Sequence, residues 1–189
     1  YHRPMAVIVI IVVVVLVGLF LMLSYNGLVR TRNQVDGAAS QIEVQQKRRY
    51  DLIPNLIETV KGYAAHERGT LEAVTNARAN AINAQQGGDV GQQAAAENAL
   101  SGALKSLFAV AEAYPDLKAN QNFLQLQAEL TSTEDRIAYA RQFFNDSVLK
   151  YNNAIQTFPR NLIAGTFHFT RREFFDAEPE TDAPPQVRF

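Results

Sequence analysis

Residues 5–23, MAVIVIIVVVVLVGLFLML, decide the fold of this chain, because they form nineteen consecutive positions without a charge or a side-chain amide. A helix of that length rises about 28 Å at ~1.5 Å per residue, close to the ~30 Å hydrocarbon core of a bilayer. In lipid every backbone group must be bonded within the segment, so a helix is favoured over a strand despite the β-branched composition. We predict a transmembrane anchor whose representative residues are Met5, Ile10, Val15, Gly18, Phe20 and Leu23.

A cleaved signal peptide is the alternative interpretation of this run. Its apolar region is usually about 7–15 residues long and ends at a small-residue cleavage site. Here the run is longer, and the sequence that follows, SYNGL (24–28), contains no such site. An uncleaved anchor is therefore favoured. Residues 1–4 form an N-terminal flank, and because Tyr1 is not an initiator Met we expect the natural chain to begin upstream.

Composition restricts the function classes. The chain has 189 residues and a formal net charge of −1, so the basic footprint of a nucleic-acid-binding protein is missing and no nucleic-acid partner is expected. It has no cysteine, which removes disulfides and thiolate chemistry. About 165 residues follow the anchor, enough for one domain with its own core.

The sequence after the anchor reads as a long helix from Ser24 to about His66. Large or apolar residues recur every seven positions at Leu28, Val35, Ile42, Arg49, Leu56 and Tyr63. This spacing is typical of a helix with one buried stripe. Pro54 lacks an N–H group and must kink or end the helix. The stripe keeps its phase through Pro54, which favours a kink, with a turn near Gly69; a turn at Pro54 is the alternative.

Three further helices are predicted, over Thr70–Gln86, from Val90 to Tyr114, and from about Leu117 to Phe158. The last has the most regular stripe, with apolar residues every three or four positions throughout. No run outside the anchor alternates like a strand. We therefore predict an all-α fold, in which the single transmembrane helix continues into an antiparallel up-down four-helix bundle with long first and last helices, spanning 24–165. Residues 166–189 form a Phe-rich, then acidic and Pro-rich, tail.

The helix lengths bear on assembly. The first and last helices are each about 40 residues, on the order of 60 Å, and the middle two are about half as long. The membrane-proximal half of the bundle then has two helices, which cannot bury both stripes alone. We expect a second copy of the chain to cover them, since most oligomers are homo-oligomers. A turn at Pro54 would weaken this expectation.

Two polar or mixed stretches are candidate interaction surfaces. The segment EVQQKRR (43–49) is unusually polar for a core-facing helix and is either a solvated face or a polar layer that meets a partner. The phenylalanines of the tail either pack on the bundle or insert at the membrane interface, where two arginines would contact anionic headgroups. The candidate residues are Gln46, Arg48, Arg49, Arg171, Arg172, Phe174 and Phe175.

No constellation of catalytic residues is present. The pair His66-Glu67 begins like a zinc-protease motif, but position 70 is Thr where a second histidine is required. Phosphate-binding glycine loops and the GxSxG motif are also missing from the sequence. We expect no catalytic, metal or cofactor site and no enzyme. Asp135, Arg136 and Arg141 are expected to form ion pairs with the 43–49 segment at the edge of the bundle seam.

Two ordered blocks of sequence resemble the LemA family. The first comprises YNGLV (25–29), RNQV (32–35), QIEVQ (41–45), KRRYDLIPNL (47–56) and ETVKGYA (58–64), and the second AYPDLKAN (113–120), FND (144–146), FP (158–159) and PQVRF (185–189). Two departures are Ala39, where relatives usually carry Trp, and Gln46, where Leu is usual. The resemblance implies a single-span anchor with a helical bundle in the bacterial plasma membrane, and no established activity.

The function expected from these observations is a non-enzymatic membrane-anchored scaffold or adaptor that self-associates through its long helices. Its partners would be the bilayer, further copies of the chain and, alternatively, another membrane protein. An accessory subunit of a membrane protease or transporter, and a membrane-remodelling protein, are the other hypotheses. Arg3 precedes the anchor, whereas Arg30 and Arg32 follow it, which leans toward a domain that faces the cytoplasm.

Overall fold

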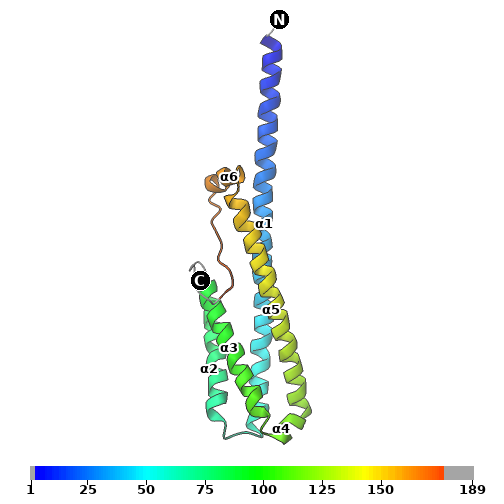
Figure 1. The fold of residues 1–189 in the computed structure, drawn as a ribbon, viewed down its shortest axis with the longest axis vertical. Helices are drawn as coiled ribbons and strands as arrows, with labels where there is room; N and C mark the ends of the chain where they lie inside the picture. Colours follow the sequence, from blue (N-terminus) through cyan, green and yellow to red (C-terminus); the bar gives the residue numbers. More distant parts are fainter. Residues whose placement is uncertain (1–2, 177–189) are drawn as a thin grey trace, which may run out of the picture. The chain divides into compact units, whose positions relative to one another are not determined.

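The computed structural model describes residues 3–176, and those residues form six α-helices and no strand (Figure 1). This confirms the predicted all-α class with a long apolar helix at the N-terminus. The helices are α1 (Arg3–Lys61), α2 (Arg68–Gly87), α3 (Val90–Ala111), α4 (Pro115–Ala119), α5 (Gln121–Gln156) and α6 (Arg160–Thr166). The acidic, Pro-rich end of the tail falls outside the described residues.

Helix α1 runs without a break from the apolar run into the rest of the chain and continues through Pro54. The proline leaves the Tyr50 carbonyl without its usual i+4 backbone donor. The Arg78 guanidinium fills this place, since its Nε donates to the Tyr50 carbonyl oxygen at 2.9 Å. The first turn of the chain therefore lies after Lys61, and not at Pro54.

The apolar part of α1 is exposed along its whole length. Within residues 3–176 it is the one helix that is long and apolar enough to cross a membrane. The core helix of a water-soluble protein would bury such a stretch, and this chain covers none of it. A lipid bilayer is the environment that suits these exposed apolar side chains, and this suggests membrane anchoring.

The chain divides into two compact units, to which both α1 and α5 contribute. The first unit comprises residues 3–41 and 142–173. The second comprises residues 42–141 and 174–176. Each unit is described by itself.

The second unit has an apolar core drawn from α1, α2, α3, α4 and the start of α5. Helices α2 and α3 lie side by side, joined by a tight turn (Figure 1). Gly88 adopts a left-handed φ of 77° in this turn, and the Asp89 side chain accepts from the Gln92 N–H at 3.0 Å to cap α3. The core residues larger than alanine that have no exposed surface are Ile53, Leu56, Val60, Val74, Leu100, Leu107 and Leu117.

The helix expected over Leu117–Phe158 is instead two helices, α4 and α5. The helix is interrupted at Asn120, whose backbone is extended. The Asn120 side-chain oxygen accepts a hydrogen bond from the Phe123 N–H at 3.0 Å. An Asn in this position satisfies a free N–H at the start of a helix, so it begins α5 at Gln121. The regular apolar spacing that predicted this helix begins only at Phe123, after the break.

The first unit contains α1 up to residue 41, the C-terminal part of α5, helix α6 and the extended segment 167–173. Leu28, Val35, Val148 and Tyr151 are buried within it. Phe169 of the extended segment is buried as well, and its ring lies 5.9 Å from that of Tyr25. The chain's own C-terminal segment therefore packs against this part of α1 and α5, and the contact with a second copy stays a prediction.

Candidate functional site

The most elaborate polar arrangement in residues 3–176 is centred on Arg49, in the second unit. Arg49 occupies a position of the buried stripe of α1, and its side chain is completely buried. One guanidinium nitrogen pairs with the Glu97 carboxylate of α3, and the other pairs with the Glu134 carboxylate of α5. Nη1 also donates to the Ser101 hydroxyl at 2.7 Å. The planar guanidinium thus joins three helices through charged hydrogen bonds.

Glu97 is almost fully buried and receives a second partner from α1. The Tyr50 hydroxyl donates to its carboxylate. Burial raises the pKa of the Tyr50 hydroxyl far above its ordinary value, and the hydrogen bond to Glu97 and the negative charge of Glu97 raise it further. Tyr50 is therefore a neutral donor to the Glu97 carboxylate, beside Arg49.

A further charged side chain close to this cluster is that of Arg141 of α5. Burial lowers the pKa of the Arg141 guanidinium, Arg49 lowers it as well, and the acidic groups Asp176, Glu97 and Glu134 raise it. Its Nη1 donates to the Asn98 side chain at 2.8 Å, and its guanidinium carbon lies 4.7 Å from the centre of the Phe175 ring. This contact is a cation–π arrangement that places Phe175 in the second unit.

The chemistry available to this cluster is structural. The guanidinium of Arg49 can only donate hydrogen bonds, and both carboxylates are engaged by hydrogen-bond donors. No group of three or more His, Cys, Asp or Glu within residues 3–176 is arranged to hold a metal ion. The geometry suits a buried ionic joint, meaning the ion pairs of Arg49 with Glu97 and Glu134, that fixes the register of α1, α3 and α5.

Gln46 lies one turn before Arg49 and is also fully buried. Its Oε1 accepts from Gln85 Nε2 at 2.8 Å, and its own Nε2 has no hydrogen-bond partner among the described residues. Gln46 and Arg49 therefore lie inside the chain's own core in this structure. Arg48, which precedes Arg49 on the same helix, is exposed.

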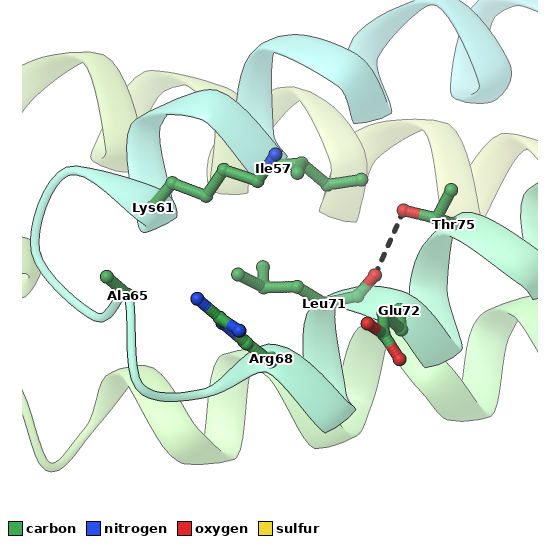
Figure 2. A pocket seen from close by; sticks show the side chains of 7 residues that line it. All are labelled: Ile57, Lys61, Ala65, Arg68, Leu71, Glu72 and Thr75. Carbon is green, nitrogen blue, oxygen red and sulfur yellow. Dashed lines mark hydrogen bonds between the residues drawn. The ribbon is translucent and has the colours of Figure 1, made fainter.

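The cavities of the second unit include two that are lined in part by charged side chains. One, of about 240 Å³, borders the ion cluster through Ser101 and Glu134. The larger, of about 480 Å³, is lined by side chains from the end of α1, the connection and the start of α2, as Figure 2 shows. Lys61, Arg68 and Glu72 surround an apolar floor there, without a nucleophile paired to a base. Neither cavity contains a catalytic arrangement.

A second polar arrangement, in the first unit, holds the extended segment 167–173. The Asn152 side chain donates to the Arg172 carbonyl at 3.0 Å and accepts from the Arg172 N–H at 2.9 Å. The Tyr151 hydroxyl donates to the Thr170 carbonyl at 2.8 Å. The Arg172 side chain pairs with Asp36 of α1 at 2.8 Å. These contacts bond the segment to α1 and α5 through both backbone and side chain.

The structure separates the tail residues that the sequence grouped. Arg172 is half-buried in its ion pair, whereas Arg171 is exposed. Phe174 is half-buried, and Phe175 is buried in the second unit. The anchor residues Met5, Ile10, Val15, Gly18, Phe20 and Leu23 are all exposed along α1.

Sequence reasoning placed Arg49 on the buried stripe but missed its partners. It expected a pair with Asp135, which is exposed, instead of with Glu97 and Glu134. The signal that was available is periodicity. Glu97 lies three residues before the apolar Leu100 and Glu134 lies four residues after Leu130, so each shares a helical face with a core residue.

Comparisons with a family model and with individual proteins show which sequences this chain is similar to. The sequence model of the LemA family matches residues 38–189. The chain is 28% identical to the magnetosome protein MamQ of Magnetospirillum gryphiswaldense, over 88% of this chain and 71% of the relative. It is 27% identical to magnetosome protein MamQ 2 of Paramagnetospirillum magneticum, over 87% and 69% respectively. It is 31% identical to protein LemA of Metamycoplasma hominis, over 74% of this chain and 63% of that protein.

None of these names is the name of an enzyme, which favours a non-enzymatic protein. The exposed apolar helix points to attachment to a membrane. The match over residues 38–189 covers most of the printed sequence, so the chain belongs to the LemA family.

Proposed function

We propose that this protein is a non-enzymatic, membrane-anchored scaffold or adaptor that self-associates through its long helices. The single observation that carries the proposal is the continuity of α1. The same helix supplies the exposed apolar span and then the buried residues Leu28, Val35 and Leu56. A rotation of the span would therefore turn residues that are packed in the folded domain. Such a helix does more than tether an independent domain.

The support for self-association is the set of large apolar side chains that the chain leaves exposed on α1 and α5 outside the span. Exposed large apolar side chains often lie in contacts between copies of a protein. Closed homo-oligomers are the commonest assemblies of soluble domains. These exposed side chains include Val44, Leu124, Tyr139, Phe143 and Leu149.

The test is crosslinking of the full-length protein in its native membrane. We expect discrete crosslinked species larger than the monomer. A flexible Gly/Ser insertion after Ser24 should reduce them, because it uncouples the span from the domain. The same insertion after Gly88, in the exposed α2–α3 turn, is the matched control and should leave them unchanged.

Two outcomes would contradict the proposal in different ways. Monomer alone at high expression would refute self-association. Unchanged crosslinking after the Ser24 insertion would show that the anchor only tethers the domain. A pull-down from the same membranes that recovered another membrane protein, without copies of this chain, would favour an accessory subunit instead.

We place the protein in the bacterial plasma membrane as a single-pass protein whose domain faces the cytoplasm. Arg30 and Arg32 follow the span and support this orientation. Protease added to intact spheroplasts should leave the domain uncut, and it should cut the domain once the membrane is permeabilised. Cleavage in intact spheroplasts would reverse the orientation.

A further inference from the structure

Helix α6 is tied at both ends to the stretch of α1 where the apolar span ends. At its start, Phe158, Pro159 and Arg160 line a cavity of about 340 Å³ together with Phe20, which belongs to the span. At its end, the ring of Phe167 lies 4.8 Å from the ring of Tyr25. Tyr25 follows Leu23, the last residue of the apolar run, by about 3 Å of helix rise. Both contacts lie within the first unit.

The membrane depth of α6 follows from these contacts. If the run 5–23 fills the hydrocarbon core, then Phe20 lies inside the core and Tyr25 lies in the headgroup region just beyond it. An element packed against both residues lies at the boundary between acyl chains and headgroups. This is the depth at which aromatic side chains and the apolar faces of short helices partition favourably.

The exposed face of this corner has the composition that the boundary requires. Ile163 and Ala164 are buried against the first unit, and this fixes which side of α6 faces outward. On the outward side Phe158 is 76% exposed, Leu162 62% and Phe167 55%, more than most apolar residues of the soluble helices. Arg160 is exposed among them and lines the same cavity as Lys150. Large apolar groups at this corner are thus combined with Arg160 and Lys150, two cations that line the same cavity as Phe158.

The charge of the surrounding unit agrees with an anionic lipid surface. Residues 24–41 and 142–173 carry six Lys or Arg and three Asp or Glu, although the whole chain has a net charge of −1. Basic residues close to a span are attracted to the anionic headgroups of the adjacent leaflet. A second copy of the chain would bring the same positive charge to this corner and is disfavoured as its occupant.

We propose that the α6 corner, Phe158, Leu162 and Phe167 with Arg160, is a second membrane contact that inserts into the interface of the bilayer crossed by α1. The contact rests on the membrane anchoring in the proposed function, and it does not require self-association. It would fix the first unit against the lipid surface at two points, the span and the corner. Two attachment points hold the unit in one orientation, whereas a span alone leaves it free to tilt.

The chain offers a direct probe, because it contains no tryptophan. Leu162→Trp places a single fluorophore at the exposed corner. The full-length variant is reconstituted into vesicles of phosphatidylcholine and phosphatidylglycerol whose acyl chains are brominated, and tryptophan quenching by bromine is measured. We expect a blue-shifted emission and loss of most of the fluorescence. Ala79→Trp, at an exposed position of α2 in the second unit, is the matched control and should remain unquenched with the emission of a water-exposed tryptophan.

Phe20→Trp separates failure of the corner from failure of the anchor. Quenching at position 20 without quenching at position 162 would overturn the proposal while leaving the anchor intact. Absence of quenching at both positions would refute the anchor as well. A blue-shifted Leu162→Trp emission that bromine does not quench would also overturn it, because the corner would then be covered by protein and not by lipid.

Discussion

The two units of this protein hold their polar side chains in opposite ways. In the second unit a fully buried arginine is enclosed by two carboxylates, and a tyrosine hydroxyl donates to one of them. In the first unit the ion pair between Asp36 and Arg172 is exposed, and a buried asparagine bonds to the backbone of the tail. A buried charge depends on each partner, whereas an exposed charge keeps water as a substitute. The same residue types should therefore differ widely in their contribution to stability.

The largest expected effect is that of Arg49→Met. It removes the charge that compensates Glu97, which is nearly inaccessible to solvent. Loss of one partner of a buried ion pair typically destabilises a protein by about 3–5 kcal/mol. Unfolding of the full-length protein in detergent micelles, followed by circular dichroism, would measure it. Arg48→Met, one residue away and exposed, should change stability by less than ~0.5 kcal/mol. Equal stability of the two variants would refute the buried ionic joint.

A smaller and local effect is expected from Asn152→Ala in the first unit. The side chain makes two hydrogen bonds to the backbone of Arg172, and both are lost. A buried backbone group left unpaired costs about 1–3 kcal/mol, here concentrated on the segment 167–173. Amide hydrogen exchange should become faster at Arg172 and stay unchanged at Leu104 in the other unit. The exposed neighbour supplies the control, Asn153→Ala, and equally fast exchange in both variants would count against the bonded tail.

Alkaline pH should affect the second unit more than the first. Burial raises the pKa of Tyr50 and also that of Tyr151, but Glu97 adds to the shift of Tyr50, whereas Arg172 and Arg32 oppose that of Tyr151. A raised pKa in the folded state means that the unfolded tyrosine loses its proton first. Stability is therefore full below the ordinary pKa of 10.0 and falls as the pH rises above it.

Tyr50→Phe should flatten this alkaline loss more than Tyr151→Phe does. The measurement is the free energy of unfolding of both variants between about pH 8 and about pH 11. An equal flattening would mean that burial alone sets both shifts, without a contribution from the Glu97 carboxylate.

The smallest effect is expected from Asp36→Asn, which removes the exposed pair with Arg172. Exposed ion pairs contribute about 0.2–1 kcal/mol, and salt screens them. The loss in unfolding free energy should therefore shrink as sodium chloride is added. A loss as large as that of Arg49→Met, or one that is insensitive to salt, would show that the two units do not differ in the way described.

Patterns within short stretches of the sequence were enough to predict some elements of the fold. The uncharged run 5–23 is sufficient for the apolar helix, since the length and hydropathy needed to span a bilayer are properties of the segment alone. The seven-residue spacing through Leu28, Val35 and Leu56 likewise predicted the buried face of α1, because side-chain direction in a helix follows from residue number. The same spacing put Arg49 inside the stripe.

Which groups meet across helices depends on the three-dimensional packing. Arg78 of α2 supplies the donor that lets α1 continue through Pro54, and Glu97 and Glu134 reach Arg49 from α3 and α5. The side chains of Asn152 and Tyr151 form hydrogen bonds with the backbone of the segment 167–173 and hold it in the first unit. These contacts join residues far apart in the sequence. Their energy depends on burial and on the direction of hydrogen bonds, which no local periodicity encodes.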